Sequence, residues 1–230
     1  MTNIKKFSVQ SLINEAVKQD RKHYTQTSWH ASSLGGCLTS SYLVRKGVVE
    51  KTFDDRTLRV FQAGRMFEDW LVGLLQKQDT RFETQVRCEW PERDLTGYAD
   101  LAINGLVYEI KSKHSKSFWY MDREGKPSRQ HEYQLWTYLK CLGKPEGRLI
   151  YIEKDSLSIR EFIVRLDDEE LAAEVDGELR ILNEAWKQGL PPEPIRDKKD
   201  WRYRYCEMHE EYCLKQPAYL EEKIKGRKSN

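Results

Sequence analysis

The dipeptide Asn104-Gly105, set between two runs of strand-forming residues, constrains the fold of this chain more than any other feature. A two-residue type I′ turn needs positive φ at both central positions, and Asn-Gly is a pair that adopts it readily. The sequence therefore predicts a tight β-hairpin. With those two residues as the loop, Ile103 faces Leu106 and Asp100 faces Glu109.

Two carboxylates opposed across a hairpin require an explanation beyond folding. Directly opposed residues have Cβ atoms about 4.5 to 5.5 Å apart, and like charges there destabilise the sheet. Period-two alternation places Lys111 on the face of Glu109. A divalent cation removes the repulsion, because Mg²⁺ binds carboxylate oxygens and retains waters, and a bound ion activates water and polarises a phosphoryl oxygen. The alternative is a solvated strand face with an incidental Glu-Lys pair.

Hydrophobic periodicity and turn residues predict the elements around this hairpin. An amphipathic helix is expected over residues 57–77, and further helices over 128–142 and from about 168 to 189. The expected strands are residues 85–90, 96–103, 106–111, 149–153 and 159–166.

The segments Gly97-Tyr-Ala-Asp100 and Tyr108-Glu-Ile-Lys111 resemble the PD-(D/E)XK nuclease superfamily, which places an Asp and an E-x-K tripeptide on adjacent strands. Two more segments resemble the RecB-like and lambda-exonuclease-like branch. Gln134-Leu-Trp-Thr-Tyr138 is similar to its Q-x-x-x-Y helix motif, and Gly64-Arg-Met-Phe-Glu68 to its G-x-x-x-E motif. All four segments occur in the order and on the predicted elements that this branch uses.

The resemblance implies a restriction-endonuclease-like α/β fold, with a central mixed sheet of about five strands flanked by helices, in one domain over residues 1–230. It implies that Mg²⁺ or Mn²⁺ is held by Glu68, Asp100, Glu109 and the backbone carbonyl of Ile110. Lys111 would serve the attacking water and the transition state. Gln134 and Tyr138 would contact the catalytic centre and a DNA phosphate, although an ordinary polar helix face is the alternative for these two.

The cysteines carry a second resemblance. Five cysteines at irregular spacing do not indicate a disulfide framework in a chain of 230 residues, and Cys88 and Cys141 are expected to be packing residues. AddB-type helicase-nucleases and CRISPR adaptation nucleases join their ends with a 4Fe-4S cluster, held by one early and three late cysteines. Cys37, Cys206 and Cys213 are similar to three of those four ligands.

Tyr203 occupies the place where the first late cysteine of that pattern is expected. His209 would complete a Cys3His set, which suits zinc or an atypical cluster. The alternative is that the metal site has been lost and aromatic packing remains. In either case we expect the segments at about 25–55 and 200–216 to pack together as a cap.

A net charge of +2 conceals a basic segment, residues 111–129, with six Lys or Arg against two acidic residues, a local charge of +4. Such a segment is compatible with a phosphate-backbone partner, and Lys113, His114 and Lys116 are the candidate DNA contacts; a solvated loop is the alternative. His131, outside any recognised motif, is expected to be structural or exposed.

The resemblance therefore implies a Mg²⁺- or Mn²⁺-dependent deoxyribonuclease, an exonuclease by analogy, acting on single-stranded DNA or duplex ends in repair, recombination, or phage or CRISPR DNA processing. Recombination, helicase or CRISPR proteins would be its partners. The rival hypothesis is a DNA-binding or assembly module that keeps the fold without turnover, and the substitution at Tyr203 favours it. We expect a cytoplasmic protein without a membrane partner, because no stretch approaches the roughly 20 apolar residues of a span and the N-terminus lacks a secretory signal.

Overall fold

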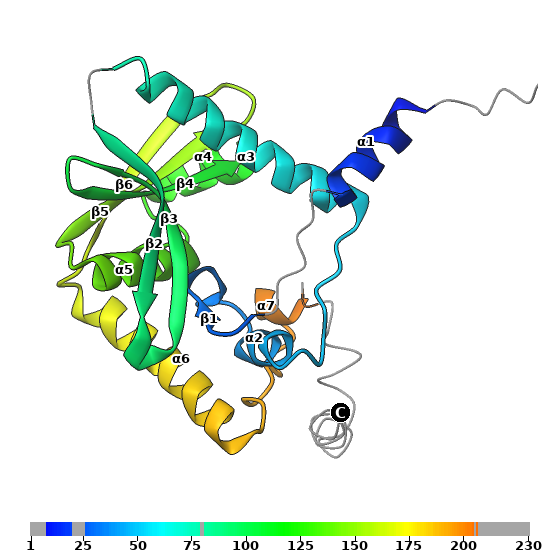
Figure 1. Ribbon diagram of the computed structural model, residues 1–230, viewed down its shortest axis with the longest axis vertical. Coiled ribbons are helices and arrows are strands. Elements are labelled where there is room, and N and C mark those ends of the chain that lie inside the picture. Colours follow the sequence, from blue (N-terminus) through cyan, green and yellow to red (C-terminus); the bar gives the residue numbers. More distant parts are fainter. Residues whose placement is uncertain (1–7, 20–25, 79–80, 205, 207–230) are drawn as a thin grey trace, which may run out of the picture. The chain divides into compact units, whose positions relative to one another are not determined.

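A computed structural model describes residues 8–19, 26–78, 81–204 and 206 of the chain (Figure 1). They divide into two compact units. The first comprises residues 1–25 and 51–79, and the second comprises residues 26–50 and 80–230. No helix within the described ranges is long and apolar enough to cross a membrane.

The first unit contains two helices, α1 (Val9–Gln19) and α3 (Asp55–Leu75). Helix α3 begins where it does because the carboxylate of Asp54 accepts a hydrogen bond from the backbone N–H of Thr57 at 2.6 Å. Lys18 of α1 and Asp55 of α3 form an ion pair at 2.7 Å. The helix expected over residues 57–77 is confirmed, with both ends shifted by two residues.

The second unit is built on one mixed sheet of six strands in the order β1-β3-β4-β5-β6, with β2 also pairing with β3. The pairs β1-β3 and β4-β5 are parallel and the others antiparallel. The five predicted strands are present, and the two-residue β1 is additional. The strands are β1 (Trp29–His30), β2 (Phe82–Trp90), β3 (Leu95–Ile103), β4 (Leu106–Lys113), β5 (Glu146–Glu153) and β6 (Ile159–Arg165).

The predicted hairpin joins β3 to β4. Asn104 and Gly105 have φ of 50° and 86°, as the type I′ turn requires. Ile103 pairs with Leu106, in the register expected from a two-residue loop. The ladder continues only to the pair Leu101 and Tyr108, so it ends one position before the two acidic residues.

The helices of this unit begin and end at residues suited to those places. Asp168 caps α6 by accepting a hydrogen bond from the backbone N–H of Leu171 at 2.9 Å, and Gly189 ends that helix at φ 73°. Residues 115–124 form a helix, so the interpretation of residues 111–129 as a solvated loop is wrong there. The helices are α2 (Leu38–Arg45), α4 (Ser115–Glu124), α5 (Arg129–Leu142), α6 (Glu169–Gln188) and α7 (Trp201–Arg204).

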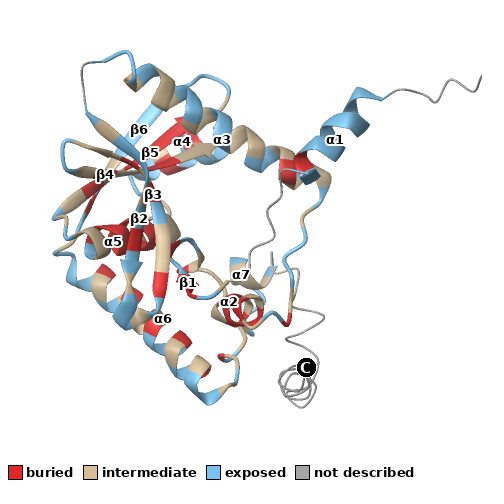
Figure 2. Ribbon diagram, viewed as in Figure 1, coloured by how far each residue is buried: buried red, intermediate tan, exposed pale blue. Residues whose placement is uncertain are grey.

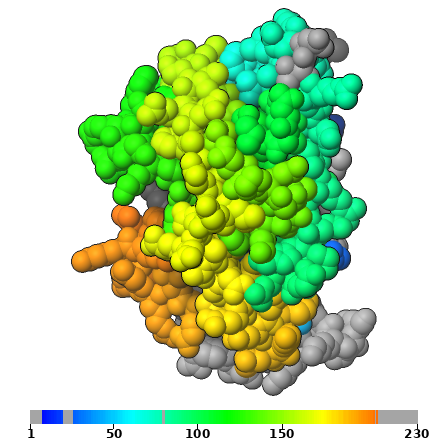
Figure 3. All heavy atoms as spheres, turned by 90° about the vertical axis from the view of Figure 1, so that its left-hand side faces the viewer, coloured from blue at the N-terminus to red at the C-terminus, as the bar shows by residue number. Residues whose placement is uncertain are grey.

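The core lies between the sheet and helices α5 and α6, which are lined with buried residues in Figure 2. Leu135 and Leu139 of α5 are fully buried against this face of the sheet. Gly147 of β5 permits the close approach, because a Cβ there would lie 2.6 Å from the carbonyl oxygen of Val107 and 3.1 Å from Leu139. Helix α6 adds five buried side chains, Leu171, Val175, Leu179, Leu182 and Ala185, and it crosses the face seen in Figure 3.

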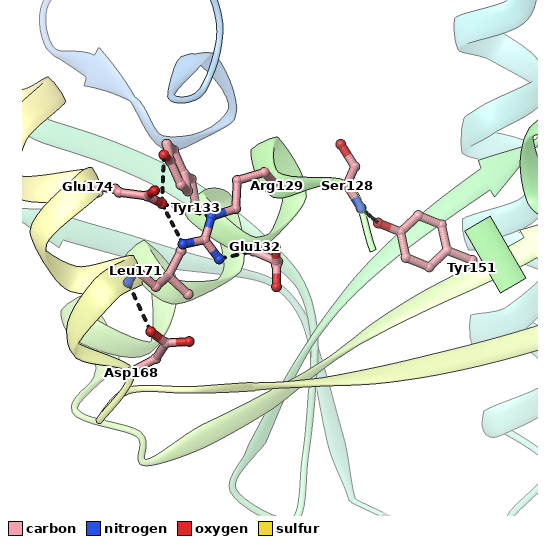
Figure 4. A network of polar contacts seen from close by, with 8 residues as sticks. All are labelled: Ser128, Arg129, Glu132, Tyr133, Tyr151, Asp168, Leu171 and Glu174. Carbon is pink, nitrogen blue, oxygen red and sulfur yellow. Dashed lines mark hydrogen bonds and ion pairs between the residues drawn. The ribbon is translucent and has the colours of Figure 1, made fainter. Parts of the chain in front are cut away.

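Polar contacts attach α5 to α6 (Figure 4). The carboxylate of Glu174 accepts hydrogen bonds from Arg129 at 2.7 Å and from the Tyr133 hydroxyl at 3.0 Å. A further carboxylate, Glu178, accepts one from the backbone N–H of Gly35 at 2.7 Å. The Glu174 bonds attach α5 to α6, and the Glu178 bond attaches α6 to the segment that precedes α2.

The segment of residues 26–50 packs against α6. The guanidinium of Arg45 lies between two indole rings, 4.1 Å from the centroids of Trp29 and Trp186. The hydrogen bond with Asp200 is the largest of the effects that raise the pKa of Arg202, on α7. Residues 207–216 lie outside the described ranges, so the cap of both ends and the single domain stay predictions.

Candidate active site

The hairpin brings Asp100, Glu109 and Lys111 together. The Oδ2 atom of Asp100 accepts a hydrogen bond from the backbone N–H of Ile110 at 2.8 Å. The carboxyl group of Glu109 lies near that of Asp100. Lys111 donates to Oε1 of Glu109, whose side chain is only 1% exposed. Two acidic side chains and one basic side chain thus lie together, with Glu109 buried and Asp100 and Lys111 half-buried.

Strand β3 does not alternate regularly where it carries Asp100. Cβ atoms built on Gly97 and on Gly147 both point at side chains of α5. Gly147 pairs with Val107, which pairs with Ala102, so position 102 also faces α5. Strict alternation would place positions 97 and 102 on opposite faces. The alternation is therefore interrupted between them, and Asp100 meets Glu109 beyond the end of the ladder rather than as a paired residue.

The electrostatics of Asp100 show opposing effects. Burial raises its pKa above the ordinary value of 3.8, because a desolvated carboxylate is disfavoured. The charge of Lys111 and hydrogen bonds from Ile110 N, Gln85 and Glu109 act in the opposite direction. A cation bound between the two carboxyl groups would favour their charged forms.

Helix α5 contributes Gln134 and Tyr138 next to the acidic residues. The side-chain amide of Gln134 donates to the hydroxyl of Tyr138 at 3.0 Å, and both side chains are buried. Burial raises the pKa of Tyr138, and the nearby charges of Glu109 and Asp100 raise it further. Tyr138 therefore stays neutral and keeps an O–H to donate. The interpretation of these residues as an ordinary polar helix face is wrong.

Gly97 explains how Tyr138 reaches the carboxylates. A Cβ at Gly97 would lie 2.6 Å from Cε1 and 3.1 Å from the hydroxyl oxygen of Tyr138. Because real Cβ atoms do not approach that closely, only glycine lets the ring lie this close to β3. The first residue of the segment Gly97-Tyr-Ala-Asp100 thus makes room for the helix motif.

Comparison with family models and with curated proteins finds no match. Solved structures do match. The structure of SSO0001 aligns at a TM-score of 0.59 and 20% identity, over 92% of this chain and 98% of that chain. LHK-Exo in complex with dAMP aligns at a TM-score of 0.56 and 15% identity, over 71% of this chain and 90% of that chain. The alkaline exonuclease LHK-Exo from Laribacter hongkongensis aligns at a TM-score of 0.50 and 14% identity, over 71% of this chain and 92% of that chain.

The chain has the PD-(D/E)XK fold. Its central mixed sheet with flanking helices confirms the fold predicted from the hairpin and its neighbours. At these sequence identities the structural similarity establishes the fold only. The chemistry has to be argued from the residues of the site. Resemblance to the AddB-type and CRISPR adaptation nucleases stays a prediction.

In the PD-(D/E)XK fold of this chain, the donor set suits a small hard cation. Mg²⁺ is held in proteins through one or two carboxylates together with water, and Asp100 and Glu109 provide two, with the Ile110 carbonyl as a third oxygen donor in the prediction. Among the described residues no group of three or more His, Cys, Asp or Glu side chains could hold a metal ion. Glu68, the further predicted ligand, lies on α3 of the first unit, and its role stays a prediction.

The candidate DNA contacts lie at the end of β4 and the start of α4. His114 is the N-cap of α4, and its Nδ1 accepts a hydrogen bond from the backbone N–H of Lys116 at 3.4 Å. Burial lowers the pKa of Lys113, whose ammonium group lies 5.2 Å from the ring centroid of Tyr151. Lys116 and His114 are exposed.

His131 lies close to Tyr151 and to the lysines of β4. Its Nδ1 is 2.8 Å from the hydroxyl of Tyr151, which also accepts a hydrogen bond from Ser128 N at 3.2 Å (Figure 4). Burial, together with the smaller effect of the charges of Lys111 and Lys113, lowers the pKa of His131 to about 3. His131 is thus a neutral, hydrogen-bonded residue, in agreement with the structural role expected for it.

The cysteines divide as the sequence indicated where the structure describes them. Cys88 is buried in the core, and Cys141 is partly buried near the end of α5, which confirms both as packing residues. Cys37 and Cys206 are partly exposed. Cys213 and His209 lie outside the described residues, so the cluster or zinc site stays a prediction.

Proposed function

We propose that this protein is a Mg²⁺- or Mn²⁺-dependent deoxyribonuclease that hydrolyses phosphodiester bonds. The observation that carries the proposal is that Asp100 and the buried Glu109 lie near each other, beside Lys111. Such a pair is unfavourable in a protein that only folds, and it is what a cation-binding site needs. The PD-(D/E)XK fold supports the proposal, as does the dAMP bound to LHK-Exo.

The roles of the residues follow from their contacts. Asp100 and Glu109 would hold the ion, which when bound would supply positive charge and a reactive water, whereas the roles of the Ile110 carbonyl and of Glu68 rest on the family resemblance alone. The backbone N–H of Ile110 orients the Asp100 carboxylate at 2.8 Å. Lys111 is placed to stabilise negative charge on the phosphoryl oxygens, and Tyr138, set by Gln134, donates its O–H to a carboxylate or phosphate oxygen.

The DNA backbone would follow the basic residues next to this centre. We assign Lys113, His114 and Lys116 to phosphate contacts, since they continue the strand that carries Glu109 and Lys111. Exonuclease action on single strands or duplex ends, and association with recombination, helicase or CRISPR proteins, are part of the same proposal. So is a 4Fe-4S cluster or Zn²⁺ on Cys37, Cys206, Cys213 and His209.

The test is cleavage of end-labelled single- and double-stranded DNA with Mg²⁺ or Mn²⁺ and with EDTA. We expect Asp100→Asn, Glu109→Ala and Lys111→Ala to lower the cleavage rate by about 10²- to 10³-fold or more, while their circular dichroism spectra stay unchanged. Glu83→Gln, an exposed acidic residue of β2, is the matched control and should cleave normally.

Two outcomes would contradict the proposal. Undiminished metal-dependent cleavage in all three variants would reject this site. DNA binding by the wild type without products under any metal condition would favour the rival hypothesis, a module that keeps the fold without turnover.

A further inference from the structure

Gln85 has an unusual backbone conformation and lies on β2 opposite Asp100. Its φ is 51°, in the left-handed region that residues other than Gly, Asn and Asp seldom adopt. It lies inside β2, where the pairs Thr84 with Leu101 and Val86 with Ala99 flank it. That register places Gln85 opposite Asp100, yet neither residue belongs to the ladder.

The positive φ of Gln85 and the interrupted alternation of β3 lie at neighbouring positions of the two paired strands. A left-handed residue rotates the strand that follows it, as in a β-bulge, and bulges occur next to active sites, where they redirect a side chain. On the neighbouring strand, the alternation of β3 is interrupted in the stretch that contains Asp100. The distortion of β2 at Gln85 thus accompanies the turn of Asp100 toward Glu109.

The side chain of Gln85 also reaches the carboxylate. It lies close enough to Asp100 to help lower the pKa of that carboxyl group, and the amide N–H is the group that can donate to a carboxylate. A second donor, the backbone N–H of Ile110, binds Oδ2 from the opposite strand at 2.8 Å. Asp100 is therefore held from both of its neighbouring strands.

We propose that Gln85 is a positioning residue, which orients the Asp100 carboxylate for cation binding from its left-handed position on β2. The inference rests on the proposed function, because it concerns the same cation. Strained residues persist where the surrounding structure holds them and gather at functional sites. Hydrogen-bond partners of metal-binding carboxylates commonly change metal affinity or activity by about 10- to 100-fold when removed.

Two substitutions separate the amide from the backbone conformation. Gln85→Gly removes the amide and suits positive φ, whereas Gln85→Ala removes the amide and keeps the strain. We expect both variants to bind Mn²⁺ about 10- to 100-fold more weakly than the wild type in isothermal titration calorimetry. Their DNA cleavage rates at fixed sub-saturating Mn²⁺ should fall similarly. The melting temperature of the Gly variant should equal or exceed that of the wild type.

The control is Arg87→Gly, two positions along on the exposed side of β2, which should bind Mn²⁺ like the wild type. If the Gly variant keeps wild-type Mn²⁺ affinity, Gln85 only shapes the strand and the inference is wrong, while the proposed function stands. If the wild type neither binds Mn²⁺ nor cleaves DNA, both the proposed function and the inference are wrong.

Discussion

At the scale of single residues, small changes in atomic position decide whether the site can form. Tyr138 reaches the carboxylates because Gly97 has no side chain. Asp100 is held by one backbone N–H and one side-chain amide from different strands. The left-handed conformation of Gln85 costs about 1 to 3 kcal/mol, a cost that the rest of the sheet must offset.

Gly97→Ala should be harmful although it adds only a methyl group. The new Cβ would lie 2.6 Å from Cε1 of Tyr138, so the ring must move within a packed core. We expect a loss of about 1 to 3 kcal/mol in the free energy of unfolding, measured by urea denaturation, together with a loss of DNA cleavage.

Gly177→Ala is the matched control for that substitution. Gly177 lies inside α6, and a Cβ there would meet nothing within 4 Å. Because alanine favours a helix over glycine, this variant should gain about 0.5 to 1 kcal/mol. A Gly97→Ala variant as stable and active as the wild type would contradict the close packing of Tyr138.

His131 makes stability depend on pH. The unfolded chain takes up a proton near pH 6.5, whereas folded His131, with a pKa of about 3, does not. The unfolded state therefore binds more protons in this window, so stability decreases as the pH falls from about 6.5 toward 3. His131→Asn, which keeps an acceptor for Tyr151, should reduce this pH dependence in urea denaturation between pH 7 and 5. His114→Asn, at an exposed histidine, is the control, and equal pH profiles for all three proteins would contradict the prediction.

At the scale of elements, the site depends on helix α5 being fixed over the hairpin. Glu174 of α6 binds both Arg129 and Tyr133 (Figure 4), and Gly147 lets α5 approach β5. Near the C-terminal end of α6, Arg45 of α2 is enclosed by Trp29 and Trp186 and donates to the backbone carbonyl of Thr27 at 2.6 Å. The two attachments hold α6 near its two ends.

Arg45→Ala should therefore destabilise the second unit more than the substitution of an exposed charged residue does. Its side chain is 3% exposed and forms an ion pair with Asp94, and cations buried against indole rings contribute about 2 kcal/mol or more. We expect a loss of about 2 to 4 kcal/mol in chemical denaturation. Arg87→Ala, whose ion pair with Glu89 is exposed, should change stability by less than about 1 kcal/mol. Equal effects of the two substitutions would contradict the role given to the indole stack.

At the scale of the whole molecule, the proposed function requires the basic residues after β4 to meet DNA beside the acidic pair. A net charge of +2 leaves little general attraction for DNA, so local contacts must supply it. Lys113 and Lys116 stand at the junction between β4 and α4, and Glu153 at the end of β5 accepts a hydrogen bond from Ser115 at 2.6 Å. That bond fixes the start of α4.

Lys116→Ala should weaken binding of single-stranded DNA and lower the salt dependence of the affinity by about 0.7 in the log-log slope, as expected for one lost phosphate contact. Fluorescence anisotropy in the Asp100→Asn background separates binding from cleavage. Lys140→Ala, an exposed lysine on α5, should leave the slope unchanged. If Lys116→Ala gives the wild-type slope, this lysine does not contact the phosphate backbone.

Local chemistry in the sequence determined the hairpin, the main helices and the fold. Asn104-Gly105 sets the turn and therefore the register, and Asp168 and Gly189 set the ends of α6, because these effects act over a few neighbouring residues. The same local order placed Asp100, Glu109 and Lys111 on two adjacent strands.

Only the tertiary structure decided how those side chains meet. The distortion of β2 at Gln85, the space left by Gly97 for Tyr138 and the burial of Gln134 and His131 all depend on residues far apart in the chain. A propensity or a motif describes the conformation that a residue favours given the residues next to it in the chain. A strained φ or a dry, neutral imidazole is adopted only when surrounding elements offset its cost, and that balance exists in the folded molecule alone.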